Sequence, residues 1–196
     1  MGGNRTRKMG HREKTCILIY TQGEKTEPIY FRSFKKRGSA FTIKIIPHPV
    51  DPKELVCYAV RDRKQAKHGC VLDVWCVFDK DDTSDSNFNE AIEAAHKNRV
   101  RVAYSIECFE LWLLLHYEDV TNPLTRDKYN ERLSCCLGEK YDKTDDKQIS
   151  GFRELQSDAI GRAKKLYEKM MRGKNYAAHN PISNVFELVE YLEEIA

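Results

Sequence analysis

The sequence predicts an α/β protein built on a parallel four-stranded sheet with helices on both faces. Four short runs are rich in β-branched and aromatic residues, at 16–20 (CILIY), 42–46 (TIKII), 74–78 (VWCVF) and 100–104 (VRVAY). Roughly 20 residues or more separate each run from the next, which suits a crossover helix and is too long for a hairpin turn. Two of the runs are apolar almost throughout, and such strands need cover on both faces, as in a doubly wound sheet.

The segments outside these runs carry helical patterns. Helices are expected between consecutive strands at about 28–37, 52–67 and 87–98. After the fourth run only helices are expected, at about 109–117, 126–136, 151–171 and 183–195. Ser183 or Asn184 is a candidate cap for the last helix, and Glu187 completes a capping-box pattern with Asn184. The polar, turn-rich stretch 138–150 is expected to be a mobile loop.

The length of 196 residues indicates one generous domain or a domain with a modest extension. We expect a basic flexible arm at 1–14, a Rossmann-like α/β core at 15–120 and a helical extension at 121–196 that packs on the core. The sequence leaves the oligomeric state open.

The composition excludes several classes of protein. With 41% hydrophobic and 32% charged residues the chain can form a sizeable core, which excludes a disordered protein. No apolar run approaches the roughly 20 residues that a membrane span requires, so no membrane partner is expected. The seven cysteines form no C-x-x-C pair. They indicate reduced thiols in a cytoplasmic protein, neither a zinc site nor a disulfide framework.

The first 14 residues carry an excess of basic side chains, with Glu13 as their single acid. Such an arm suits binding along nucleic-acid phosphates, where each neutralised charge releases counterions. A solvated tail is the alternative, because the net charge of +3 does not by itself require a polyanionic partner. The basic residues concerned include Arg5, Arg7, Lys8 and Arg12.

Acidic residues follow two of the predicted strands, where ligands bind in open α/β sheets. Gly23 allows a tight turn after the first run, and Glu24 and Glu27 come next. Asp79, Asp81 and Asp82 follow the third run. Carboxylates clustered at a strand end repel one another, and a hard divalent cation relieves that repulsion. The alternatives are an acidic turn that caps the next helix and, for the glutamates, favourable charge in a first helical turn.

The fourth run leads into a helix with two distinct faces. Glu107 and Glu110 are three residues apart and share one face, which is expected to look toward the strand ends. The other face is apolar and includes Trp112 and His116. A hydrogen-bonded position at the edge of the core is therefore expected for His116, in preference to a role as ligand or base.

These segments, taken in order, resemble the RloB-like proteins of the Toprim superfamily, which are linked to restriction and abortive infection. The resemblance covers most of 16–192 and is carried by 23–31 (GEKTEPIYF), 79–81 (DKD), 105–116 (SIECFELWLLLH) and 180–185 (NPISNV), each of the first three with its preceding strand. It implies a Toprim fold and hydrolysis of phosphodiesters with Mg²⁺ or Mn²⁺.

The resemblance also implies roles for individual residues. Asp79 and Asp81 would be metal ligands, Glu27 matches the second acid of the nuclease motif, and Ser105 with Glu107 or Glu110 supplies a further polar or acidic group. The metal set expected on this basis is Glu27, Asp79, Asp81, Asp82 and Glu107. The catalytic set is Gln22, Glu24, Glu27, Asp79, Asp81, Glu110 and Lys174, of which Lys174 would stabilise charge.

Gln22 departs from the family pattern, because Toprim proteins normally have Glu immediately before the first glycine. An amide cannot carry negative charge to a metal or accept a proton at neutral pH. Three interpretations of Gln22 follow. It is a natural variation for which Glu24 or Glu27 compensates, it marks an enzyme inactivated by engineering, or it indicates a domain that only binds its ligand. The Asn-Pro expected after Ser105 is likewise replaced by Ile106-Glu107.

Two functional hypotheses follow. The first is a metal-dependent nuclease of bacterial antiphage defence that acts on DNA or RNA, including transfer RNA. The second is a nucleic-acid-binding or effector subunit with weak or no activity that works with an ATPase. The residues expected to contact nucleic acid are Arg5, Arg7, Lys8, Arg12, Lys25, Lys80, Arg172 and Lys174.

Overall fold

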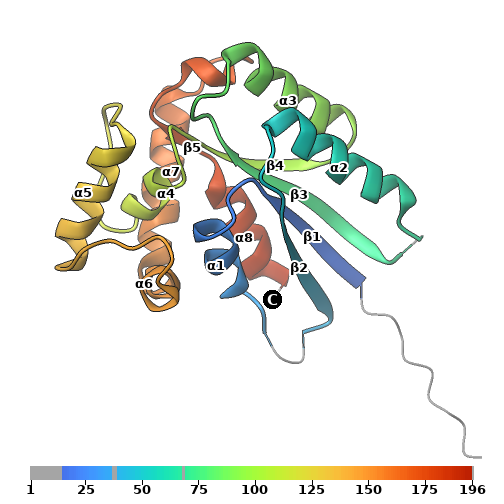
Figure 1. Cartoon of the computed structure of the whole chain (residues 1–196), viewed down its shortest axis with the longest axis horizontal. Helices are drawn as coiled ribbons and strands as arrows, with labels where there is room; N and C mark the ends of the chain where they lie inside the picture. Colours follow the sequence, from blue (N-terminus) through green and yellow to red (C-terminus); the bar gives the residue numbers. More distant parts are fainter. Residues whose placement is uncertain (1–14, 37–38, 68, 196) are drawn as a thin grey trace, which may run out of the picture.

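The computed structural model describes residues 15–36, 39–67 and 69–195, and a five-stranded sheet lies at its centre (Figure 1). The strand order is β2-β1-β3-β4-β5. The first four strands pair in parallel, as the sequence predicts, and the fifth pairs antiparallel to β4. Their bounds are β1 Thr15–Thr21, β2 Phe41–Pro47, β3 Val71–Asp79, β4 Arg101–Ile106 and β5 Ile182–Ser183.

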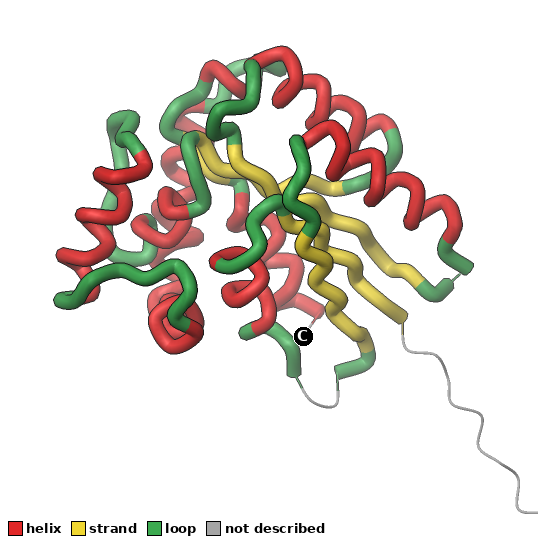
Figure 2. Tube along the Cα trace, viewed as in Figure 1, coloured by secondary structure: helices red, strands yellow, loops and turns green. Residues whose placement is uncertain are grey.

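Helices cover both faces of the sheet (Figure 2). The helices α2 and α3 lie on one face, while α1 and α8 lie on the other. The segments α4 to α7 pack beside α1 and α8 and enlarge the same core. The bounds are α1 Thr26–Arg32, α2 Pro52–Gln65, α3 Asp85–Lys97, α4 Glu110–Leu114, α5 Arg126–Leu137, α6 Asp146–Gly151, η1 Phe152–Leu155, α7 Gln156–Met170, η2 Tyr176–Ala178 and α8 Val185–Ile195.

Alternation along the central strands explains why they are apolar almost throughout. Ile17 and Ile19 of β1 face the core under α1 and α8, whereas Leu18 and Tyr20 face the core under α2 and α3. Successive side chains of a strand point to opposite faces, so a strand covered on both sides needs apolar residues at every position. The doubly covered sheet predicted from the sequence is therefore confirmed.

The sheet has one strand more than the sequence predicts, and β5 consists of only two residues. Asn184 extends its pairing by side-chain contacts. The Tyr104 N–H donates to Asn184 Oδ1 at 2.6 Å, and Asn184 Nδ2 donates to the Val102 carbonyl at 3.0 Å. This side chain takes the place of a strand backbone along β4. The predicted cap position lies directly before α8, where the Ser183 hydroxyl accepts a hydrogen bond from the Val185 N–H at 3.4 Å. The segment 121–196 is accordingly more than helical, since it completes the sheet.

The stretch 138–150 is also more ordered than the loop expected there. It includes most of α6, and the side chains of Tyr141 and Ile149 are buried. The Ser134 hydroxyl accepts a hydrogen bond at 2.9 Å from the backbone N–H of Tyr141, which attaches the segment to α5. The prediction of a loop rested on the polar composition of this stretch, and it overlooked the two buried side chains that anchor it.

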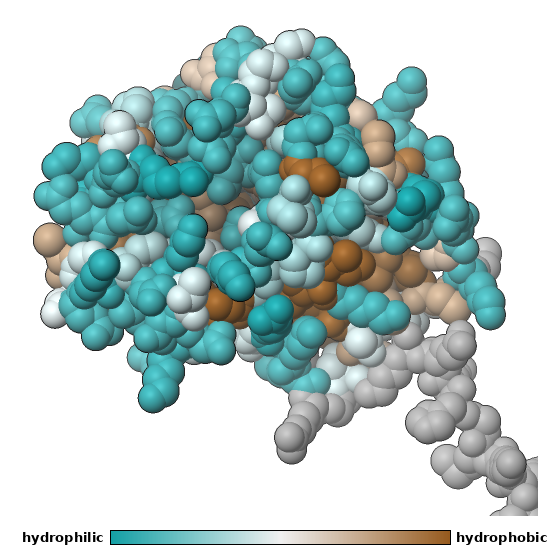
Figure 3. All heavy atoms as spheres, viewed as in Figure 1, coloured by the Kyte–Doolittle hydropathy of each residue, from teal (hydrophilic) through white to brown (hydrophobic). Residues whose placement is uncertain are grey.

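The surface in the view of Figure 3 is mostly hydrophilic, with a hydrophobic area in the region of β2. This edge strand keeps Ile43 and Ile45 only partly buried. Among the described residues, no helix combines the length and apolar character needed to cross a membrane.

Candidate functional site

An acidic pocket of about 270 Å³ lies where β1 and β3 end and α1 begins. The sequence predicts a site at this edge of the sheet. Carboxylates, two lysines and one arginine line the pocket together with the turn around Gly23. Its lining residues are Gln22, Gly23, Glu24, Lys25, Thr26, Glu27, Asp79, Asp81, Phe109, Glu110, Arg126 and Lys143.

Glu27 is the most enclosed acid at this edge, with 6% of its surface exposed. Burial, together with the charge of Glu110, raises its pKa to about 7, while backbone hydrogen bonds and Lys143 act in the opposite direction. The carboxylate lies so close to the turn that a Cβ on residue 23 would be 2.0 Å from Glu27 Oε2. Glycine is therefore required at position 23 for this placement.

Asp79 is the last residue of β3 and points into the same pocket. Burial raises its pKa well above the usual range, and the negative charges of Glu27 and Glu110 add to the rise. The positive charge of Arg126 opposes these effects. Because Glu110 raises the pKa of both Glu27 and Asp79, and Glu27 raises that of Asp79, the three carboxylates share one electrostatic environment.

Glu110 begins α4 and is 9% exposed. The Tyr141 hydroxyl donates a hydrogen bond to Glu110 Oε1 at 3.2 Å. Thr26 Oγ1 donates to the Lys143 carbonyl at 3.3 Å, so the same segment is attached to α1. The stretch 138–150 thus forms a wall of the acidic pocket.

Two cations of the pocket were not identified from the sequence, Arg126 and Lys143. Arg126 Nη2 lies 2.9 Å from Asp81 Oδ2 at the rim. Arg126 is the first residue of α5, where the helix dipole disfavours a positive charge. That unfavourable position was a usable sequence signal, whereas nothing in the local sequence distinguishes Lys143 from other exposed lysines.

The structure brings together Gln22, Glu24, Lys25, Glu27, Asp79, Asp81 and Glu110 from the predicted set. Asp82 and Glu107 do not line the pocket. Glu107 supports the site only through its backbone, since its carbonyl accepts a hydrogen bond from the N–H of Asp81 at 3.0 Å. Ser105 is fully buried, and its hydroxyl lies 3.0 Å from that of Ser183, so it joins β4 to β5.

The predicted basic residues are spread over several surfaces. Lys80 Nζ lies 3.0 Å from Asp85 Oδ1, and Lys174 Nζ lies 3.8 Å from Glu93 Oε2 on α3. Arg172 donates to backbone carbonyls at the end of α7. These three residues do not line the acidic pocket. The predicted contacts Arg5, Arg7, Lys8 and Arg12 lie outside the described residues.

His116 takes the buried position that the sequence predicts. Its Nδ1 lies 3.0 Å from the Trp112 carbonyl, and its Nε2 lies 3.4 Å from the Tyr30 hydroxyl. Burial lowers its pKa to about 4, with the backbone contacts opposing that effect. A neutral imidazole with two hydrogen-bond partners is a structural element of this core.

The donor chemistry of the acidic pocket suits a hard divalent cation, since buried carboxylates that repel one another are stabilised by such an ion. In the conformation described, however, no three Asp, Glu, His or Cys side chains among residues 15–36, 39–67 and 69–195 are arranged around one ion position. Metal binding would therefore require adjustment of side chains around Glu27 and Asp79.

Comparison with protein families finds a match to the model described as RloB-like protein over residues 17–192. No curated protein and no solved structure matches the chain.

Proposed function

The chain belongs to the RloB-like family, and from that premise we propose that it is a nuclease that depends on Mg²⁺ or Mn²⁺. The observation that carries the proposal is that one pocket gathers Glu27, Asp79 and Glu110, and that burial together with the charge of Glu110 raises the pKa of both Glu27 and Asp79. Buried acids with strongly perturbed pKa values are typical of functional sites. The resemblance of the sequence to Toprim nucleases supports phosphodiesters as the substrate and antiphage defence as the setting.

Glu27 and Asp79 are the residues that would hold the metal, with Glu110 beside them. A bound divalent ion would polarise the phosphate and lower the pKa of a coordinated water molecule. Glu110, which is oriented by the Tyr141 hydroxyl, is the further carboxylate of the pocket that would accept a proton. Exclusion of water from the buried part of the pocket strengthens each of these charge interactions.

The substrate backbone would lie along the cationic side of the pocket. A neighbouring hollow of about 500 Å³ shares Glu110, Arg126 and Lys143 with it and adds Lys140 together with the acids Glu131 and Asp142. Guanidinium and ammonium groups bind phosphate oxygens, and Arg126 is oriented for this task by Asp81. This arrangement suits a nucleic-acid strand, DNA or RNA, more than a small neutral substrate.

Gln22 favours a second candidate function, a nucleic-acid-binding subunit with little or no activity that works with an ATPase. Its side-chain oxygen accepts a hydrogen bond from the Asp79 N–H at 3.1 Å. The amide thus holds the pocket together without supplying charge, at the position where the family pattern has Glu. A domain that uses the pocket only for binding would need this structural hydrogen bond but not the negative charge of a glutamate.

Cleavage assays on single-stranded and duplex DNA and on transfer RNA, with Mg²⁺ or Mn²⁺, test both candidates. The chain as given is compared with Gln22→Glu, Asp79→Asn and the matched control Asp82→Asn, which changes an exposed acid that does not line the pocket. A nuclease loses cleavage in Asp79→Asn and keeps it in Asp82→Asn.

The Gln22→Glu variant separates the remaining outcomes. Cleavage by both forms means that other acids compensate for Gln22. Cleavage only by Gln22→Glu means that the given sequence retains the site but lacks one necessary charge. Binding of nucleic acid without cleavage by either form contradicts the nuclease proposal and supports the binding subunit.

A further inference from the structure

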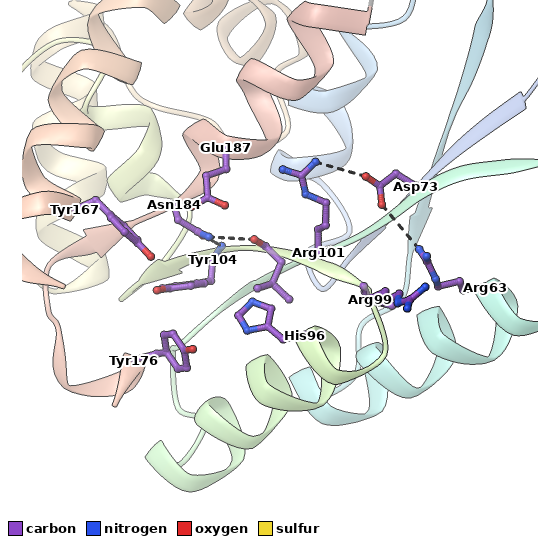
Figure 4. Close-up of a pocket in the computed structure, with 12 residues that line it drawn as sticks. Arg63, Asp73, His96, Arg99, Arg101, Tyr104, Tyr167, Tyr176, Asn184 and Glu187 are labelled. Carbon is purple, nitrogen blue, oxygen red and sulfur yellow. Dashed lines mark hydrogen bonds and ion pairs between the residues drawn. The ribbon is translucent and has the colours of Figure 1, made fainter. Parts of the chain in front are cut away.

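A second cavity, of about 560 Å³, lies at the other end of β4 from the acidic pocket (Figure 4). The elements around it are α2, β3, α3, β4, α7, η2 and α8. Arginines lie toward one end and tyrosines toward the other, with His96 between them. The main lining residues are Arg63, Arg99, Arg101, Tyr104, Tyr167 and Tyr176.

The arginine end has an excess of positive charge. Asp73 is its only carboxylate, and it lies 3.5 Å from Arg101 and 4.0 Å from Arg63. Arg101 is also held in place by the ring of Trp75, 4.0 Å from its guanidinium carbon. Arg99 forms no ion pair with any part of the chain that the structure describes. The cavity thus has three guanidinium groups and two carboxylates, Asp73 at this end and Glu187 toward the tyrosines. Arg99 is the guanidinium group left to bind an anion.

Arg99 is held at a fixed place in the turn between α3 and β4. Its φ is 57°, a left-handed conformation that few non-glycine residues adopt. Its N–H donates to the carbonyl of His96 at 3.1 Å, which closes the turn. The backbone thus places an unpaired guanidinium group at the rim of the cavity.

The tyrosine end offers aromatic faces and a polar atom without a hydrogen bond. Tyr104 is 2% exposed, and its buried hydroxyl makes no hydrogen bond of normal geometry, although it faces Tyr167. The ring of Tyr176 lies 6.3 Å from that of Tyr104 and 6.2 Å from that of His96, both edge to face. Tyr104 is itself too buried to touch a ligand ring, whereas the partly exposed rings of Tyr167 and Tyr176 can stack against a planar ring.

Glu187 of α8 lines the same cavity near the tyrosines. Burial raises its pKa, and the charge of Arg101 together with Asn184 opposes that rise. An ionised carboxylate only accepts hydrogen bonds, so it selects ligands with N–H donors. Adenine, cytosine and guanine each carry an amino group with two N–H donors. Uracil has only the single N3–H, which is flanked by two carbonyl oxygens that repel a carboxylate, so Glu187 favours the amino-bearing bases.

We infer that this cavity binds a nucleoside phosphate, with the phosphate against Arg99 and the amino-bearing base between the tyrosines and Glu187. Its volume lies in the range of small-molecule pockets. The inference is independent of the proposed nuclease function, because the cavity and the acidic pocket share no lining residue. The ligand is either a free nucleotide or the terminal nucleotide of a nucleic-acid strand.

Calorimetric titration of the full chain in EDTA tests the inference, with AMP, GMP, CMP, UMP and inorganic phosphate as probes. At least one amino-bearing monophosphate is expected to bind with 1:1 stoichiometry and more tightly than UMP or phosphate. Arg99→Gln should weaken it by about tenfold or more, whereas Arg99→Lys keeps the charge and most of the affinity. Glu187→Gln should reduce the preference over UMP. Asp79→Asn, in the separate acidic pocket, should leave the affinity for nucleotides at this cavity unchanged.

Three results would overturn the inference: no binding by any mononucleotide or by a 5′-phosphorylated tetranucleotide, equal affinity for phosphate and nucleotides, or binding that Arg99→Gln and Glu187→Gln leave unchanged. Thermal unfolding of each variant establishes that it is folded.

A 5′-phosphorylated tetranucleotide distinguishes the two possible ligands, a free nucleotide and the end of a nucleic-acid strand. Binding of the mononucleotides identifies a free nucleotide, and binding of the tetranucleotide alone, weakened by Arg99→Gln, identifies a strand end. Cleavage assays are not involved, so failure of the nuclease proposal does not affect this test.

Discussion

The side-chain oxygen of Gln22 accepts a hydrogen bond from the backbone N–H of Asp79 at 3.1 Å, and this contact joins the ends of β1 and β3 at the acidic pocket. A neutral amide makes the link without adding charge beside the buried carboxylates. The pocket is therefore less repulsive than one with Glu at position 22, and it attracts a cation less strongly.

Gln22→Glu is expected to make the protein more dependent on a divalent ion. The carboxylate can still accept from the Asp79 N–H, but it adds negative charge near Glu27 and Asp79. The free energy of unfolding without metal should fall by about 1–3 kcal/mol. Thermal unfolding with EDTA, Mg²⁺ and Mn²⁺ measures the effect, and a metal-induced stabilisation no larger than that of the unsubstituted chain would contradict it.

Gly23→Ala is expected to displace the Glu27 carboxylate, because the added Cβ would lie 2.0 Å from Oε2. The cost should be about 1–3 kcal/mol, typical of overpacking, together with loss of any stabilisation by metal. Gly161→Ala is the control, since an added Cβ there meets no atom within 4 Å. In a Glu27→Ala background the penalty of Gly23→Ala should largely disappear, and its persistence would show that the clash lies elsewhere.

The stability of the metal-free protein is expected to depend on the protonation of Glu27. Its folded pKa of about 7 exceeds the usual 4.5, so the native state binds the proton more tightly. This contribution is fully present below pH 4.5 and is lost as pH rises through 7. Glu27→Gln should remove that decline, which amounts to about 3 kcal/mol at most. Urea unfolding in EDTA at pH 5 and pH 8 measures it, and parallel declines in both proteins would exclude Glu27 as the source.

Arg126→Gln is expected to weaken nucleic-acid binding and to flatten its salt dependence. Each lost phosphate contact reduces the number of counterions released, so the slope against log salt should fall by about 1. Arg132→Gln is the matched control, because Arg132 lies on the same helix, pairs with Glu118 and does not line the acidic pocket. Fluorescence anisotropy at several salt concentrations measures the slopes, and equal slopes for the two variants would remove Arg126 from the proposed binding surface.

Local sequence properties were sufficient to predict four strands and the edge of the sheet that carries the acids. The continuous apolar runs of β1 and β3 can be recognised from adjacent residues alone. The same pattern could not predict β5, because two residues are too few to show a period and Asn184 forms the remaining contacts with β4 through its side chain.

Chain order, hydrophobic pattern and charge spacing together placed Glu27 and Asp79 at one edge, since parallel strands bring their carboxyl ends to the same side. The tertiary structure alone selected Glu110 over Glu107, brought Arg126 and Lys143 to the rim, and assigned Gln22 a hydrogen bond to Asp79. It also assembled the arginine and tyrosine cavity from elements far apart in the chain. These features depend on the direction of side chains and on where distant segments pack, which nearest neighbours in the sequence do not specify.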